Sequence, residues 1–136
     1  MPNTFAKKIG MVASDLIYYR QASTLANPVP ALTSNFILID FREPSNHENG
    51  MLLYAIGTDQ HDSSTYEWIV DGITLPVSGT AKPGGIYDPL IFPEPIRCMQ
   101  YVQLLVTNNN ADGYPNSNGA PGDQIPYEGV IIGRWV

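Results

Sequence analysis

Residues 66 to 77 read YEWIVDGITLPV, two short β-rich runs on either side of a two-residue turn signal. In an extended chain, one face of the first run carries three large side chains, Tyr66, Trp68 and Val70. Asp71-Gly72 is typical of tight hairpin turns, because both residue types tolerate positive φ. The stretch therefore predicts an antiparallel hairpin whose Trp68 face lies in a core.

Beyond this hairpin, similar β-rich runs are separated by turn residues at roughly 8 to 12-residue spacing. Residues 35–42 and 51–57 flank Asn49-Gly50, another hairpin signal, and we expect these two runs to pair. Residues 97–107 form the longest alternating run, and residues 129–136 end the chain as a further strand. The pattern predicts an all-β fold, an antiparallel sandwich or jelly-roll-like barrel with an N-terminal arm and long loops.

The predicted core consists of apolar positions that alternate along these runs. They are Ile37, Ile39, Leu53, Trp68, Val70, Val102, Leu104, Val106 and Ile131. Cys98 is the only cysteine and is expected to be a small core or sheet residue. Because a lone cysteine cannot form an internal disulfide and no secretory leader is recognisable, we expect the protein to be made in a cytoplasm.

The first thirty residues differ from the rest in charge. Residues 1–20 hold three basic side chains and one acid, a local charge of +2, whereas the remaining residues carry −8. Apolar positions from Phe5 to Tyr19 fit helical spacing, but Gly10 weakens a helix, and extended structure from about residue 11 is the alternative. The sequence predicts an arm over residues 1–30, with a frayed end as the alternative, and a single β-sandwich domain over residues 31–136.

The overall composition restricts the possible partners. The net charge is −6 and the isoelectric point about 4.6, so the surface repels phosphate backbones and we expect no nucleic-acid partner. Hydrophobic residues make up 43% of the chain, which suits a folded domain. No apolar stretch approaches the length of a membrane span, so we expect no membrane partner.

Metal-binding patterns in the sequence are incomplete. Asn108-x-Asn110-x-Asp112-Gly113 imitates the start of a calcium loop, but Asn and Gly occupy its first and twelfth positions, where acids are needed. Asp59, His61 and Asp62 could hold a transition metal only if His47 came near. No hydrolase or phosphate-binding motif is present. We therefore predict no cofactor, no catalytic metal and no enzymatic activity.

The longest connection, residues 107–127, contains five Asn and three Pro and almost nothing suited to a core. Pro-rich stretches also occur at Asn27–Pro30 and Gly79–Pro95. A compact β domain with these extended stretches, an N-terminal segment and no active-site motif resembles small virion structural proteins of bacteriophages, of the head-decoration or coat kind. The resemblance implies a non-enzymatic shell subunit that contacts its neighbours through loops and arms.

This resemblance also implies partners and contact residues. The partners would be the major capsid protein, other virion proteins and further copies of this chain, with a trimer as the expected oligomer in a virion assembled in the host cytoplasm. The expected contact residues are Lys7, Lys8, Pro83, Tyr87, Asn110, Asp112, Tyr114 and Asn118.

The alternative function is a carbohydrate- or receptor-binding β module. In such a module, exposed aromatic rings would stack on sugar rings. The candidate rings are Tyr54, Tyr66, Trp68 and Trp135. Burial of the two tryptophans in the core is the competing interpretation.

Overall fold

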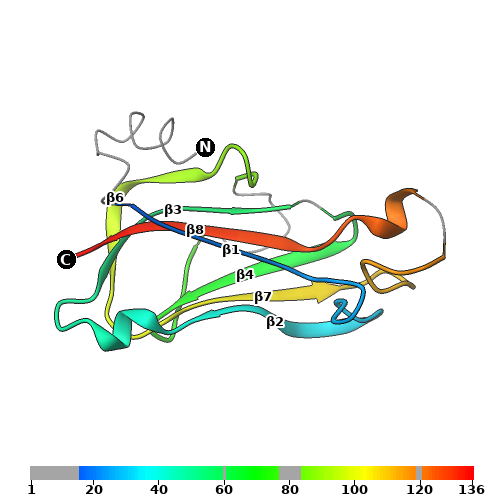
Figure 1. Cartoon of the computed structure of the whole chain (residues 1–136), viewed down its shortest axis with the longest axis horizontal. Coiled ribbons are helices and arrows are strands. Elements are labelled where there is room, and N and C mark those ends of the chain that lie inside the picture. The colour runs from blue at the N-terminus through cyan, green and yellow to red at the C-terminus, as the bar shows by residue number, and fades with distance from the viewer. Residues whose placement is uncertain (1–15, 60, 77–83, 119–120) are drawn as a thin grey trace.

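Eight strands in the described residues form two four-stranded antiparallel sheets that pack face to face, which confirms the predicted all-β sandwich (Figure 1). The computed structural model describes residues 16–59, 61–76, 84–118 and 121–136. The first sheet has the order β1 (Ile17–Ala22), β8 (Glu128–Trp135), β3 (Met51–Thr58), β6 (Leu90–Cys98). The second has the order β2 (Thr33–Phe41), β7 (Val102–Asn108), β4 (Ser64–Val70), β5 (Ile73–Thr74). Two short 3-10 helices, η2 (Glu43–Asn46) and η3 (Pro121–Gln124), lie in connections.

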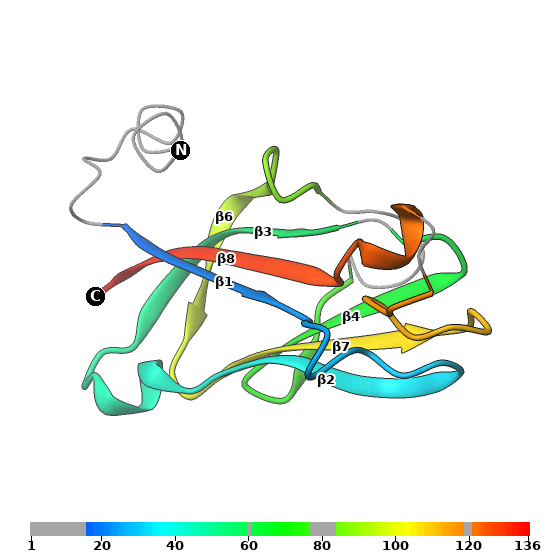
Figure 2. The ribbon, with the colours of Figure 1, turned by 45° about the vertical axis from the view of Figure 1, so that its right-hand side comes forward.

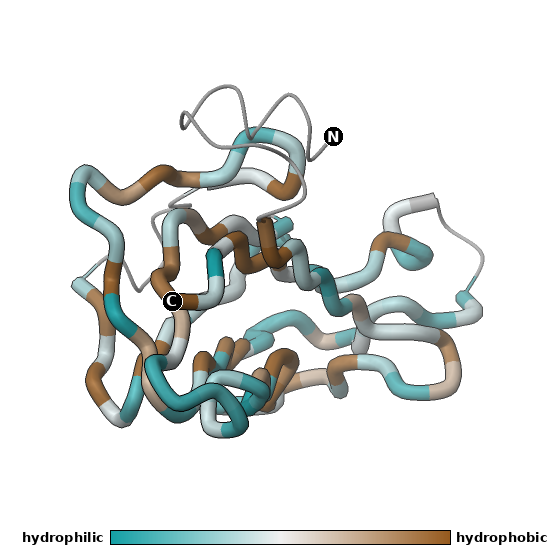
Figure 3. Tube along the Cα trace, turned by 60° about the vertical axis from the view of Figure 1, so that its left-hand side comes forward, coloured by the Kyte–Doolittle hydropathy of each residue, from teal (hydrophilic) through white to brown (hydrophobic). Residues whose placement is uncertain are grey.

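The core lies between the sheets and consists mainly of alternate residues of the inner strands. Trp68 of β4 and Leu104 of β7 belong to one buried cluster with Leu53 of β3 and Ile131 of β8. Figure 3 shows brown, hydrophobic positions interspersed with white and teal ones along the trace. The core prediction is confirmed for eight of its nine residues, Ile39, Leu53, Trp68, Val70, Val102, Leu104, Val106 and Ile131.

Ile37 is the exception, at 53% exposure, because β2 contains a β-bulge. Ile37 lies opposite Leu105 of β7, and Ile39 lies opposite the adjacent residue, Leu104. Leu38 is therefore an extra residue in β2, and it shifts the alternation by one position. As a result Leu38 and Ile39 are both buried.

The predicted hairpin of residues 66–77 is confirmed for its described part. Ile69 of β4 pairs with Thr74 of β5, and Val70 pairs with Ile73. The two turn residues, Asp71 and Gly72, both have positive φ, at 49° and 85°. This is the geometry that the Asp-Gly pair predicts, because its twist matches that of the flanking strands.

The predicted pairing of residues 35–42 with residues 51–57 is wrong, although both segments are strands. β2 pairs with β7, whereas β3 pairs with β6 and β8, so the two strands belong to different sheets. Gly50 ends the connection between them with φ of 70°, and a Cβ there would lie 2.3 Å from the carbonyl oxygen of Cys98. Asn49-Gly50 is therefore not a hairpin turn. Glycine is needed at position 50 because its φ is positive and because the backbone of Cys98 lies too close for a side chain.

The alternating run of residues 97–107 is likewise two strands and not one. β6 ends at Cys98 and β7 begins at Val102, and the turn between them leads from the first sheet to the second. The Asp71 carboxylate fixes this turn by accepting three backbone N–H groups at 2.7, 2.8 and 3.0 Å, those of Met99, Gln100 and Tyr101. Cys98 is buried, as expected, and burial raises the pKa of its thiol to about 12.

β1 belongs to the first sheet, which corrects the predicted end of the arm at residue 30. The whole of β1 pairs with β8, from Ile17 opposite Gly133 to Ala22 opposite Glu128. Val29 has no exposed surface and lies in the core. β1 and Val29 are therefore part of the sandwich, because Ile17, Tyr19 and Val29 pack in its core. Residues 1–15 lie outside the described residues.

Candidate functional site

A pocket of about 380 Å³ is formed by residues of one end of the sandwich. Figures 1 and 2 show that this end lies opposite the C-terminus. β3 ends here and β4 and β8 begin here, beside the connection from β1 to β2 and the loop from β7 to β8. We call residues 23–32, 108–118 and 121–127 the loop end. The pocket is lined by Asp59, His61, Asp62, Asn110, Tyr114, Gly122, Asp123 and Ile125.

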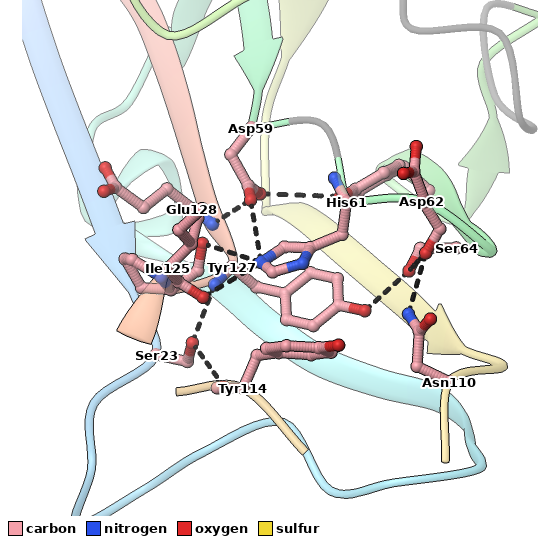
Figure 4. Close-up of polar contacts among 12 residues, drawn as sticks. Ser23, Asp59, His61, Asp62, Ser64, Asn110, Tyr114, Ile125, Tyr127 and Glu128 are labelled. Atoms are coloured by element: carbon pink, nitrogen blue, oxygen red, sulfur yellow. Dashed lines mark hydrogen bonds and ion pairs between the residues drawn. The ribbon is translucent and has the colours of Figure 1, made fainter. Parts of the chain in front are cut away.

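His61 occupies the middle of this pocket wall and binds the loop end (Figure 4). Its Nε2 lies 3.0 Å from the carbonyl oxygen of Ile125 and 3.2 Å from that of Pro126. Both partners are acceptors, so Nε2 carries the proton and donates it. The imidazole also packs against the rings of Tyr114 and Tyr127, with centroid distances of 4.5 and 4.0 Å. Burial lowers the pKa of His61, so the ring is neutral at neutral pH.

Asp59 connects the end of β3 to the start of β8. Its backbone N–H donates to Glu128 O at 3.0 Å, and its Oδ1 accepts the backbone N–H of Glu128 at 2.8 Å. The other oxygen, Oδ2, is weakly paired, because its polar neighbour His61 Nε2 is 3.3 Å away and directs its proton to carbonyl groups. Burial raises the pKa of Asp59 to about 7, although the Glu128 N–H favours the carboxylate.

Tyr127 is fully buried and fastens the other side of the loop end. Its backbone N–H donates to Ser23 Oγ at 2.8 Å, and Ser23 Oγ donates to Tyr114 O at 3.0 Å. Its phenol lies 2.5 Å from Ser64 Oγ. Because Ser64 Oγ donates to Asp62 O, the Tyr127 hydroxyl is the donor in that contact. The Ser64 hydroxyl thus bonds to Asp62 O and to Tyr127 within the fold.

In its described residues the Asn-rich loop contains only one short 3-10 helix between β7 and β8, and the amides of its own side chains hold part of it in place. Asn108 has no exposed surface; its Nδ2 donates to Pro30 O and Asp112 O, and its Oδ1 accepts the N–H of Asn110. Asn110 Nδ2 in turn donates to Asp62 O at 2.7 Å. The calcium-like spacing therefore belongs to an Asn-rich turn whose Asn108 side chain bonds to the protein backbone.

The possible metal ligands of the sequence are not brought together. His47 stacks on Trp135 with a centroid distance of 3.7 Å and lines a different, larger pocket with Arg42 and Gln100. His61 and Asp59 contact each other, but in the described part of the chain no group of three or more His, Cys, Asp or Glu side chains is arranged to hold a metal ion.

Four of the expected contact residues, Asn110, Asp112, Tyr114 and Asn118, lie in the loop end. Asp112 and Asn118 are exposed, whereas Asn110 and Tyr114 are half-buried and hold the loop. Tyr87 lies apart from them, 73% exposed, with the Arg20 guanidinium 5.5 Å from its ring centroid. Lys7, Lys8 and Pro83 lie outside the described residues.

Sequence reasoning missed two features of this end. The first is the set of exposed apolar side chains in the loop end, Leu25, Leu32 and Ile125. They stand singly among turn residues, so no periodicity marks them. The second is the contact of His61 with Tyr114 and Tyr127, which lie far along the chain. Sequence reasoning singled out residues 59–62 only as possible metal ligands and not as contacts of the loop end.

The four aromatic residues considered for a sugar platform do not form one. Tyr66 and Trp68 are buried, at 1% and 0% exposure. Trp135 packs against Phe41 and His47. Tyr54 is half-buried on β3. The tryptophans therefore act mainly in packing, as the competing interpretation predicted for Trp68.

Comparisons of the chain with protein families, with curated proteins and with solved structures found no match. No helix among the described residues is long and apolar enough to cross a membrane.

The Asp59→Asn variant is expected to match the native protein in stability near pH 4 and to exceed it at pH 7 and above. The raised pKa of Asp59, about 7, means that the folded protein keeps a proton that the unfolded chain releases above its ordinary value of 3.8. The native protein therefore loses up to about 1.4 kcal/mol per pH unit between these two values, a loss that the amide does not suffer. Urea unfolding of both proteins from pH 4 to pH 8 measures the difference. A native protein that gains stability relative to the variant as the pH rises would contradict the raised pKa of Asp59.

Proposed function

We propose that this protein is a non-enzymatic structural subunit of a virion, a capsid decoration or coat protein that contacts its neighbours through the loop end. The observation that carries the proposal is the exposure of large apolar side chains on the loop end, whose backbone is held by hydrogen bonds. Leu25 is 64% exposed, Leu32 73% and Ile125 52%. The backbone is held at Leu32, whose N–H donates to Asn110 O, and at Ile125, whose carbonyl oxygen accepts from His61. Leu25 lies between Thr24 and Asn27, whose backbones bond to each other.

Such a surface suits repeated contacts between subunits. Burial of one large aliphatic side chain contributes about 1.5–3 kcal/mol. A loop that is already ordered loses little conformational entropy when it binds. In a symmetric shell each contact is repeated many times, so weak single contacts are sufficient.

The chemistry of the pocket supports a structural role over a catalytic one. His61 donates to backbone carbonyl groups, and Ser64 and Tyr127 bond to each other. These contacts join the loop end to Ser64 of β4 and to His61 just before it. The acidic net charge of −6 favours protein partners over nucleic acid. The partners we propose are the major capsid protein and other copies of this chain, in a virion assembled in the host cytoplasm.

The double variant Leu32→Ser/Ile125→Ser is expected to fold normally but to lose most of its association with the shell. Both side chains are exposed, so polar replacements leave the core intact. The protein is co-expressed with the shell protein encoded in the same genome, and the particles are sedimented and analysed by gel. We expect at least ~5-fold less of the variant than of the native protein on the particles. Ile73→Ser, which changes a 70% exposed side chain on β5, is the matched control and is expected to bind normally.

Two results would contradict this proposal. One is native protein that does not sediment with the particles, and the other is a double variant that sediments with them as the native protein does. Native protein that stays off the particles but binds an immobilised glycan would favour the carbohydrate-binding alternative.

A further inference from the structure

Among the described residues, the two sheets have four edge strands, and three of them carry features that hinder pairing with another chain. The β6 edge contains the exposed Pro93 and Pro95, beside an interruption of its register with β3. β2 has a bulge at Leu38 and a positive φ of 55° at Asn35. β5 is only two residues long, Ile73–Thr74. Short strands, prolines and bulges are the usual means by which proteins protect sheet edges.

β1 is the fourth edge and carries none of these features. Its six residues, Ile17–Ala22, pair with β8 in an unbroken register and include no proline. The sequence IYYRQA is rich in aromatic and β-forming residues. An edge of this kind is a template for another strand.

The hydrogen bonds at the end of β1 show which backbone groups face outward. Ser23 N–H donates to Tyr127 O, whereas Glu128 bonds through its own backbone to Asp59 on the β3 side. In an antiparallel ladder the N–H and C=O of alternate residues point to the same side. Tyr19 and Gln21 therefore face β8, and Tyr18 and Arg20 present their backbone groups to the open edge.

We propose that two copies of this chain pair antiparallel through β1, with Tyr18 of each copy opposite Arg20 of the other. Tyr18 and Arg20 both have outward-facing backbone groups, so this register forms about four hydrogen bonds around a two-fold axis. It joins the two first sheets into one continuous sheet. The contact is self-complementary, as a two-fold interface requires.

The side chains favour this register over its neighbours. Tyr18 and Arg20 lie on the outer face of the first sheet, opposite Ile132 and Val130 of β8. Arg20 forms an ion pair with Glu128 of its own chain, and pairing it with tyrosine places an aromatic ring beside this cation, a favourable contact. A register with Arg20 opposite Arg20 would place like charges together, which is unfavourable.

This pairing does not depend on the proposed shell function, because it follows from the edge of β1 alone. It predicts a dimer as the smallest assembly, in place of the trimer expected from the sequence. The contact is small, so the dimer is expected to dissociate on dilution.

Light scattering of the native protein over a concentration series is expected to show the mass rising from 14.9 kDa toward twice that value. Two variants of one position test the register. Tyr18→Arg places a second cation opposite Arg20 and is expected to weaken association at least ~10-fold. Tyr18→Glu places a carboxylate there and is expected to associate at least as well as the native protein. Both variants lose the same ring, so a difference between them reports the charge of the partner residue.

Tyr18→Pro removes an outward N–H that β8 does not use and is expected to give a folded monomer. If this variant does not fold, the arginine and glutamate variants decide the question. The proposal is overturned if the native protein stays monomeric or forms a trimer, if the two charged variants associate equally, or if a folded Tyr18→Pro protein dimerises as the native one does.

Discussion

Replacement of Asp71 with alanine is expected to lower the free energy of unfolding by about 3 kcal/mol, the sum of lost charge-assisted hydrogen bonds and a left-handed backbone unsuited to alanine. Asp71 has φ of 49°. Its carboxylate accepts the three N–H groups of the turn from β6 to β7, where the chain passes from one sheet to the other. Without it that turn loses its only described side-chain acceptor.

Urea unfolding measures this loss, with Asp112→Ala as the control. Asp112 is exposed and is expected to change stability by less than about 0.5 kcal/mol. In the Asp71→Asn variant the asparagine tolerates the positive φ and keeps one acceptor oxygen, so we expect a smaller loss of stability than in Asp71→Ala. An Asp71→Ala protein as stable as the native one would show that the turn forms without the carboxylate.

The Asp71 carboxylate is also expected to make the stability of the protein depend on pH in the acid range. Burial alone would raise the pKa of Asp71, but the N–H groups of Met99, Tyr101 and Gln100 lower it below the ordinary value. The folded state therefore releases a proton that the unfolded chain keeps, and the stability gained above pH 4 is lost as the pH falls through the folded pKa. Asp71→Asn is expected to lack this part of the acid dependence.

Replacement of His61 with alanine is expected to lower the free energy of unfolding by about 2–3 kcal/mol, because a packed ring and a buried hydrogen bond are both lost. The imidazole lies against Tyr114 and Tyr127 and donates to the carbonyl groups of Ile125 and Pro126. Without it the loop end keeps the contacts of Asn110 with Asp62 and of Tyr127 with Ser64 but loses the ring between them. We expect backbone amides of residues 110–116 and 122–127 to exchange hydrogen faster, while those of β7 stay protected.

His47→Ala is the matched control, since His47 is exposed and stacks on Trp135 at the other end of the sandwich. It is expected to leave amide exchange in the loop end unchanged. Unaltered exchange in the His61→Ala protein would contradict the role of His61 in holding this surface.

The sequence predicted those parts of the fold that depend on neighbouring residues. Asp71-Gly72 specifies its hairpin because turn and strands lie within about ten residues. Asn49-Gly50 has the same appearance, but the partners of β3 are β6 and β8, which lie far along the chain. Which distant strands pair depends on how the two sheets pack, and the β-propensity of a single segment carries no information about that packing. The bulge at Leu38 is invisible for a similar reason, since it is defined by the register with β7.

The candidate site was predictable only in part. The composition of residues 107–127 identified the loop, and residues 59–62 stood out as polar and acidic. The contacts of Asn108 with Pro30 and of Tyr114 with Val29 join segments about eighty residues apart, so sequence reasoning treated the loop as irregular. Leu32 and Ile125 are exposed because the folded loops leave them uncovered. No local sequence pattern predicts which side chains the loops will cover.

An electron-microscopy reconstruction of the assembled particle tests the proposed function most directly. We expect density for the sandwich on the shell, with Leu25, Leu32 and Ile125 buried against neighbouring subunits. A particle that lacks this chain, or that carries it with the loop end facing solvent, would contradict the proposal.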